Sequence, residues 1–449
     1  MKTFNVSEAI NSIGVNKMTW LIFFLIGFTT VFDGFDYMLV SYTMPQIAEE
    51  WGLNEVQTGS LASWSSLGML IGATISGIIS DKIGRRKMVS GFVIVFSLFT
   101  FPIYFVNSYE LYVLFRICAG IGLGACVPVV SVLLSEFAPV NKRAIFISLN
   151  TCFMTLGYVL AGIVATIIIP IFGWRFCYLL GGLPFLYAIY QYRHILESPH
   201  WLASKGRKSE ACAVLERLEK NGKGYSTGQW QPNNLVVPPP PKSVGFKALF
   251  KGKYLRTTVT LALIEFCVYF IIYGFNAWMP SLMMQKGFDM TTAYVLTIAQ
   301  NFSAILSGIL CGYGSEIFGR KLNAIMSFFL TAVAIVALAF VQGVWPILMA
   351  CIFLGFIRSY MASSVPPITV ESFRTEFRNT GVSFCVGIGR ASGIISPIIV
   401  GYILQIGLGY VGAMTFFILP CLVAILLLSS IKVETKGKTF EQLAEEYEL

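Results

Sequence analysis

The sequence Gly77-Ile-Ile-Ser-Asp-Lys-Ile-Gly-Arg-Arg-Lys87 has a second copy further along the chain, Gly312-Tyr-Gly-Ser-Glu-Ile-Phe-Gly-Arg-Lys321. We call the displacement from Gly77 to Gly312 the repeat offset (312 − 77 = 235). Further landmarks share this offset, namely Met44-Pro45 with Met279-Pro280, Glu136 with Glu371, and Arg143 with Arg378. A constant displacement over several segments predicts that the chain is built from two parallel repeats of one structural unit.

The composition indicates an integral membrane protein. The chain is 56% hydrophobic and 12% charged, and its mean hydropathy is +0.72, which is far from soluble globular usage. Twelve apolar stretches have roughly the 20-residue length that a helix needs to cross a bilayer. They lie near residues 19–42, 56–80, 88–107, 111–135, 144–169, 174–195, 254–283, 292–315, 323–342, 346–371, 381–405 and 412–431. Because the alternating pattern of membrane strands is absent, we predict an all-α membrane protein of two six-helix repeats.

A polar segment separates the two repeats. We expect an N-terminal bundle at 1–195, a cytoplasmic central loop at 196–253, and a C-terminal bundle with a cytoplasmic tail at 254–449. The cations of the connecting loops fall in alternate loops, and therefore on one side of the membrane, at Lys82, Arg85, Arg86, Lys87, Lys142, Arg143, Arg320, Lys321, Arg374 and Arg378. By the positive-inside rule, this side and both termini face the cytoplasm. We expect the protein to lie in the cell (inner) membrane. The net charge of +9 then comes largely from this excess of cations beside the lipid bilayer, and it does not indicate binding to nucleic acid.

Two carboxylates, Asp33 and Asp36, lie inside the apolar run from Trp20 to Tyr42. Each costs roughly 3 kcal/mol in a membrane helix, so such groups usually line a water-filled path or meet a partner charge. Residues three apart share one helix face. Counting along the helices places Arg116 at the depth of these acids, so we expect an ion pair that couples transport to protons. A purely structural buried pair is the alternative.

The second repeat carries its own buried charges. Glu265 and Arg358 fall at matching depths and are predicted to pair with each other and to contact substrate. Arg390 lies alone near mid-depth, where its planar fork suits a substrate carboxylate, although it could instead cap a neighbouring helix. The remaining candidates for the substrate cavity, for each of which packing is the alternative, are Tyr37, Tyr273, Asn276, Gln300 and Asn301.

The sequence indicates neither catalysis nor a cofactor. The ten cysteines show no metal-ligand spacing, and no set of nucleophile, base and orienting residue appears. We therefore expect a monomer that binds a small-molecule substrate and protons, with no metal, no cofactor and no enzymatic activity.

The doubled G-x-x-x-D/E-x-x-G-R-[RK] loop, with twelve predicted helices and a long central loop, resembles the major facilitator superfamily over essentially the whole chain. The resemblance implies transport by alternating access at a central site, with a cytoplasmic gate of loop charges. The implied gate residues are Asp81, Arg85, Arg86, Glu136, Arg143, Glu316, Arg320, Glu371 and Arg378. We expect Asp81 to accept hydrogen bonds from helix-end amides and an arginine. Charges that only set the topology are the alternative.

Two families within this superfamily compete. The sequence Asp33-Gly-Phe-Asp36 resembles the signature of aromatic acid:proton symporters, which implies proton-coupled uptake of carboxylated aromatic compounds. In contrast, Glu197-Ser-Pro-His-Trp-Leu202 and Glu434-Thr-Lys-Gly437 resemble signatures of sugar porters and related metabolite symporters. Because His200 replaces the usual arginine and the seventh helix lacks paired glutamines, an organic acid is favoured over a sugar, polyol or other neutral metabolite. Efflux by antiport and a non-transporting receptor follow as further alternatives.

Overall fold

The computed structural model describes residues 3–223, 230–237, 249–250, 254–373 and 378–431. Within these ranges, ten helices are long and apolar enough to cross a membrane, and the bent pair 290–306 and 310–318 adds an eleventh span. The short helices α7 (Trp174–Gly181) and α8 (Pro184–His194) together cover the stretch predicted at 174–195. The predicted all-α architecture of twelve transmembrane helices is therefore confirmed.

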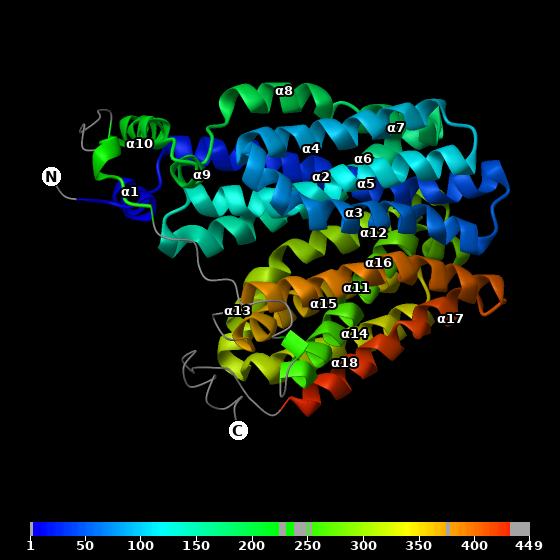
Figure 1. Cartoon of the computed structure of the whole chain (residues 1–449). Coiled ribbons are helices and arrows are strands. Elements are labelled where there is room, and N and C mark those ends of the chain that lie inside the picture. Colours follow the sequence, from blue (N-terminus) through cyan, green and yellow to red (C-terminus); the bar gives the residue numbers. More distant parts are fainter. Residues whose placement is uncertain (1–2, 224–229, 238–248, 251–253, 374–377, 432–449) are drawn as a thin grey trace. The chain divides into compact units, whose positions relative to one another are not determined.

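The first repeat contains the helices α2 (Lys17–Trp51), α3 (Glu55–Ile83), α4 (Arg85–Thr100) with η1 (Phe101–Phe105), α5 (Tyr109–Phe137), η2 (Val140–Lys142), α6 (Arg143–Phe172), α7 and α8. The second contains α11 (Tyr254–Gln285), α12 (Met290–Ser303) with η5 (Ala304–Leu306), α13 (Ser307–Phe318), α14 (Arg320–Phe340), α15 (Val344–Glu371), α16 (Arg378–Gln405), α17 (Gly409–Phe416) and α18 (Ile418–Ser430) (Figure 1). The helix starts at 55, 85, 109 and 143 recur at 290, 320, 344 and 378, each displaced by the repeat offset. The predicted repeat is thus present in the helix boundaries themselves.

Spans in the described part of the chain are interrupted at several points, which the apolar pattern did not predict; α17 and α18, for example, are separated at Phe417. Pro184 begins α8, and because proline lacks a backbone N–H it cannot continue the hydrogen bonds of α7. The span of α12 and α13 bends by 54° at a short 3-10 turn. Hydropathy reports only the polarity of a stretch, so it places these spans correctly and misses their breaks.

Contacts divide the chain into two compact units. The first contains residues 1–37, 68–158 and 175–241, and the second contains 38–67, 159–174 and 242–449. By their contacts, the first-repeat segments 38–67 and 159–174 therefore belong to the same unit as the second repeat. The assignment of bundles at 1–195 and 254–449, which follows the repeat, stays a prediction.

A small helical subdomain, formed by short helices outside the transmembrane spans, belongs to the first unit. It is formed by α1 (Val6–Ile13), α9 (Pro199–Ser204), α10 (Lys208–Lys223) and η3 (Pro232–Asn234). Its buried hydrophobic residues are Val6, Ala9, Ile10, Trp201, Leu202, Ala203, Ala211, Cys212, Leu215, Trp230 and Leu235. The backbone of Phe4 forms a bridge with that of Leu235, so the start of the chain is tied to the central loop.

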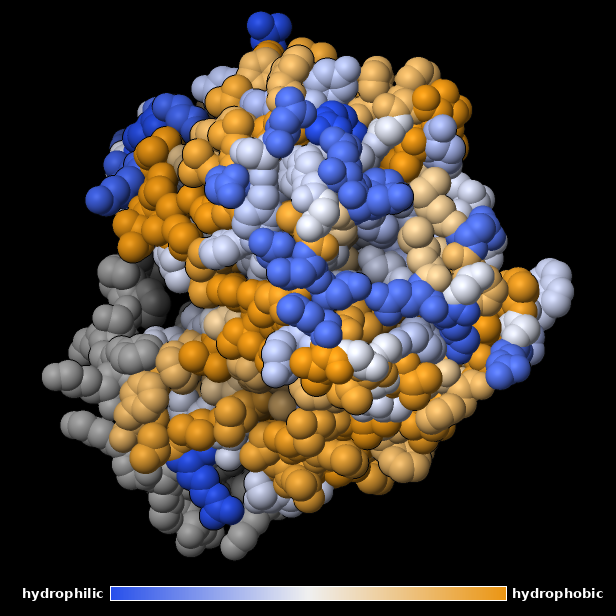
Figure 2. All heavy atoms as spheres, turned by 90° about the vertical axis from the view of Figure 1, so that its right-hand side faces the viewer, coloured by the Kyte–Doolittle hydropathy of each residue, from blue (hydrophilic) through white to orange (hydrophobic). Residues whose placement is uncertain are grey.

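The exposed surface of the helices is strongly apolar. Large side chains such as Phe28, Leu114, Ile167, Phe302 and Leu426 are exposed, as expected for residues that face lipid. Seen from the side on which α2 ends and α3 begins, hydrophilic side chains are interspersed with hydrophobic ones across the face (Figure 2). We call this side the outer end, since the charge rule predicts that it faces away from the cytoplasm.

The orientation can be tested by thiol labelling. Eight of the ten cysteines are buried, so replacing the other two, Cys118 and Cys152, by serine should leave little background labelling. A thiol introduced as Glu49→Cys, at an exposed position of α2, should react with a membrane-impermeant maleimide added outside intact cells. One introduced as Ser209→Cys, exposed on α10, should react only after permeabilisation. The reverse pattern would overturn the predicted topology.

Candidate functional site

The first candidate site is a buried ion pair between α2 and α5. Arg116 Nη1 lies 3.0 Å from Asp36 Oδ2, and both side chains are almost completely buried. Thr100, the last residue of α4, donates a hydrogen bond of 2.7 Å to the other carboxylate oxygen, Oδ1. The contact predicted between a helix-1 acid and Arg116 is therefore present, and Asp36 makes it.

Aromatic groups surround this pair. The Arg116 guanidinium carbon lies 6.0 Å from the centre of the Tyr178 ring on α7. The Tyr178 hydroxyl is hydrogen-bonded to that of Tyr112 at 2.9 Å. Asp33 lies one turn before Asp36 and is also buried. The ring of Tyr37, a predicted cavity residue, lies 5.9 Å from that of Tyr158 on α6.

The chemistry of this pair follows from its burial. Two opposite charges in a low-dielectric interior stabilise one another, and loss of one partner typically costs about 3–5 kcal/mol because the other charge is left uncompensated. Protonation of Asp36 would deprive Arg116 of its counter-charge. The site can therefore link the binding of a proton to any event that supplies Arg116 with another negative group.

The pairing predicted between Glu265 and Arg358 is wrong. Glu265 on α11 accepts a hydrogen bond of 3.0 Å from Thr369 on α15. Arg358 donates instead to the carbonyl of Ile272 at 3.4 Å. Ile272 is seven residues beyond Glu265, which is about 10 Å along a helix. The depth estimate was in error by about two turns, because counting residues from the expected ends of two helices gives only a coarse depth.

Arg390 lies half-buried on α16 beside two tyrosines of α11. Its guanidinium interacts with the hydroxyl of Tyr269, and the rings of Tyr269 and Tyr273 stack at 5.8 Å with 23° between their planes. A methyl group added at Gly389 would come within 2.5 Å of the Tyr269 ring, and one at Gly393 equally close to Tyr273. These two glycines therefore seat the tyrosine rings against α16. Among the described residues, no carboxylate is ion-paired with Arg390.

Three other predicted cavity residues, Asn276, Gln300 and Asn301, are buried in the second unit. The side chain of Asn301 interacts with the hydroxyl of Tyr42. The Oε1 atom of Gln300 has no hydrogen-bond partner within the described part of the chain. Buried polar atoms are normally satisfied, so an acceptor left open on α12 suits a polar ligand that can donate to it.

Six of the nine predicted gate residues form the same three-residue cluster in each repeat. Arg85 lies 2.7 Å from Asp81 and 3.6 Å from Glu136. In the second repeat, Arg320 lies 3.0 Å from Glu316 and 3.5 Å from Glu371. Corresponding members are again separated by the repeat offset. Each arginine begins one helix and contacts acids at the ends of two others within its own unit.

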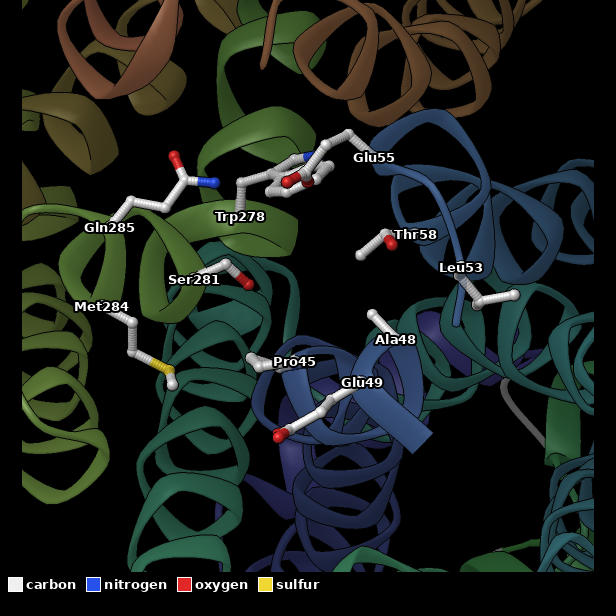
Figure 3. A pocket seen from close by; sticks show the side chains of 10 residues that line it. All are labelled: Pro45, Ala48, Glu49, Leu53, Glu55, Thr58, Trp278, Ser281, Met284 and Gln285. Carbon is white, nitrogen blue, oxygen red and sulfur yellow. The ribbon is translucent and has the colours of Figure 1, made fainter. Parts of the chain in front are cut away.

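A separate cavity of about 290 Å³ opens at the outer end of the second unit. It is lined by Pro45, Ala48, Glu49, Leu53, Glu55, Thr58, Trp278, Ser281, Met284 and Gln285, and the Ser281 hydroxyl points into it (Figure 3). Ser281 is twelve residues beyond Tyr269, the contact of Arg390 on α11, or about 18 Å along the helix. This cavity is therefore distinct from the cluster around Arg390.

The family model of the Major Facilitator Superfamily matches residues 26–313 and 295–446. The chain belongs to the major facilitator superfamily. It is 28% identical over 438 residues to the niacin transporter NiaP of Acinetobacter baylyi, covering 97% of this chain and 98% of the relative. It is 29% identical over 420 residues to the 4-hydroxybenzoate transporter PcaK of the same organism, covering 92% and 91%.

Solved structures of the superfamily confirm the fold. The inward-open xylose transporter XylE from E. coli matches with a TM-score of 0.72 at 18% sequence identity, covering 95% of this chain and 99% of that one. At this level of identity the likeness concerns the fold alone, and it carries no information on the ligand.

One part of the expected superfamily gate is arranged differently from the prediction. Glu197, rather than Asp81, accepts the helix-end amides, from the backbone N–H groups of Arg85 at 2.9 Å and Arg86 at 3.0 Å. The side chain of Arg86 donates to the carbonyl of Tyr192, so it stands outside the charge cluster. Glu197 was missed as a site residue because its partner lies 112 residues earlier in the chain. The sequence signal that could have identified Glu197 is its position directly before Ser198-Pro199, where α9 begins.

The two remaining gate candidates, Arg378 and Arg143, have contacts of a different kind. Arg378 donates to the carbonyl of Phe373 at 3.1 Å. Arg143 lies near His200, and burial, followed by the charge of Arg143, lowers the pKa of His200 to about 4. His200 is therefore neutral at pH 7 and does not supply the cation that an arginine would supply at this position. The second half of the sugar-porter-like resemblance, 434–437, lies outside the described residues.

Proposed function

We propose that the protein is a proton-coupled symporter that takes up a small aromatic carboxylate by alternating access. The observation that carries this proposal is the arrangement of Arg390 beside the stacked rings of Tyr269 and Tyr273. A guanidinium next to aromatic faces matches a ligand that carries a carboxylate on a flat ring. The names of the relatives NiaP and PcaK point to ligands of the same chemistry.

The proton would be carried by the pair of Asp36 and Arg116. When Asp36 is ionised, the pair is neutral overall and the buried charges hold α2 against α5. When Asp36 is protonated, the contact weakens, and a state with different contacts at these helices becomes relatively more stable. Substrate and proton are then transported together because each alters the balance between the same two states.

Uptake of a sugar is the competing function. The similarity to XylE concerns the fold alone, and α11 offers tyrosines at the positions facing Arg390 where hydroxyl recognition would need amides. A neutral sugar would also leave the charge of Arg390 uncompensated, whereas a carboxylate would neutralise it. We therefore place the organic acid first.

Uptake by proteoliposomes tests the proposal directly. With an inward proton gradient, radiolabelled 4-hydroxybenzoate or nicotinate should accumulate above its outside concentration, and a protonophore should abolish the accumulation. Labelled xylose, presented to the same vesicles, should enter no faster than into protein-free liposomes. Accumulation of xylose without accumulation of either acid would contradict the proposal.

A further inference from the structure

Glu265 is a buried acid that the proposed coupling pair does not use. It lies within α11, only 2% exposed, and the hydroxyl of Thr369 donates to its Oε1 atom at 3.0 Å. No lysine or arginine in the described ranges forms an ion pair with it. Asp36, in contrast, has Arg116. An ionised carboxylate at membrane depth is costly without a cation, so a bound proton is the simplest way to neutralise Glu265.

The repeat shows that the fold itself does not require this acid. By the repeat offset, Glu265 corresponds to Thr30 in the first repeat, and Cys385 corresponds to Asn150. In the first repeat, the Thr30 hydroxyl bonds the Asn150 side chain at 3.0 Å. In the second, Cys385 lies within electrostatic range of Glu265. An uncharged pair packs the same place in one repeat, so packing does not explain the acid in the other.

The surroundings of Glu265 connect it to Arg390. Tyr269, one turn along α11, interacts electrostatically with Glu265 and also with Arg390 on α16. The backbone of α16 approaches closely here, since a methyl group added at Gly389 would lie 3.0 Å from the Glu265 carbonyl oxygen. The groups that interact with Glu265 are thus Thr369 from α15, Tyr269 from its own helix and Cys385 from α16, and Tyr269 also contacts Arg390 of α16.

We propose that Glu265 is a second proton-binding site, whose proton is taken up together with the carboxylate that binds Arg390. The ligand's negative charge cancels that of Arg390 and lies near Glu265, and a nearby like charge favours the protonated acid. The proton comes from water and forms only the O–H bond of the carboxyl group. The coupling to substrate rests on the proposed function, whereas the proton site itself does not.

Infrared difference spectroscopy of the protein in lipid, between acidic and alkaline buffer, tests the site without any ligand. The wild type should show a carbonyl stretch from a buried protonated carboxyl group. This component should be lost in Glu265→Gln and kept in Asp36→Asn. As a matched control, Glu49→Gln removes an exposed acid and should leave the component unchanged.

Two further variants protect the test against misfolding. Glu265→Thr introduces the residue that the first repeat already accommodates, and it should lose the same component. Thr369→Val keeps the acid but removes its hydrogen bond, so the carbonyl band should persist at a displaced frequency. An unchanged band in both Glu265→Gln and Glu265→Thr would overturn the proton site. If neither Glu265 variant folds, an unchanged band in Thr369→Val would overturn it.

Addition of 4-hydroxybenzoate or nicotinate at fixed pH tests the coupling. The Glu265 component should grow in the wild type and show no growth in Glu265→Gln. If the component titrates with pH but neither acid changes the wild-type spectrum, the proton site is confirmed and the link to an aromatic acid is refuted. If a ligand changes other bands and not this one, the proposed function survives and the coupling through Glu265 is refuted.

Discussion

Replacing Asp36 by asparagine should abolish proton-driven accumulation of substrate. The side chain keeps its shape but can no longer carry the proton, and Arg116 loses its buried counter-charge. A pH difference of one unit is worth about 1.4 kcal/mol per proton, which supports roughly tenfold accumulation in the wild type. In Asp36→Asn, the ratio of inside to outside concentration of 4-hydroxybenzoate in proteoliposomes should fall to about one.

Counterflow separates loss of coupling from loss of folding. Exchange of labelled for unlabelled 4-hydroxybenzoate needs no net proton movement, so it should continue in Asp36→Asn. Glu110→Gln is the control, because it removes an exposed acid on α5, the helix of Arg116, and should leave accumulation driven by protons. Since an unpaired Arg116 is costly, the double change Asp36→Asn with Arg116→Gln should restore stability without restoring accumulation. Normal uphill transport by Asp36→Asn would remove this acid from the mechanism.

The fold was predictable because corresponding motifs of the two repeats are separated by a constant number of residues. The doubled loop motif led to corresponding helix starts, and the arginine clusters around Arg85 and Arg320 followed from the same correspondence. Motifs of this kind can be recognised because they combine local spacing with charge, and both can be read without a structure.

The candidate site was predictable only in part, because depth along a helix is a coarse measure. The depth along the helices correctly predicted the contact between Asp36 of α2 and Arg116 of α5. It failed for Glu265 and Arg358, which contact Thr369 and the carbonyl of Ile272 instead. The seating of Tyr269 on Gly389 could not be predicted, since helix rotation decides which side chains meet and the sequence pattern of a buried helix is apolar on every face.

Replacing Arg390 should produce the largest loss of affinity for a carboxylated ligand. Lysine keeps the positive charge but loses the planar fork, and alanine loses both. Affinity for 4-hydroxybenzoate should therefore fall in the order wild type, Arg390→Lys, Arg390→Ala. A hydrogen bond to a charged group contributes about 1.5–3 kcal/mol, so the alanine variant should bind about tenfold more weakly or worse. Calorimetry or a thermal-shift titration of the purified protein measures this directly.

The control for this series is 4-hydroxybenzamide, which has the same ring and no charge. Its affinity should change much less than that of the acid in either variant, because Arg390 then loses only a neutral partner. Gly393→Ala is the matched variant for the ring, since the added methyl group would displace Tyr273 while leaving Arg390 in place. It should weaken the acid and the amide equally. If Arg390→Ala also weakened both ligands equally, Arg390 would act by holding α16 against α11, and the assignment of an anionic substrate would lose the residue on which it depends.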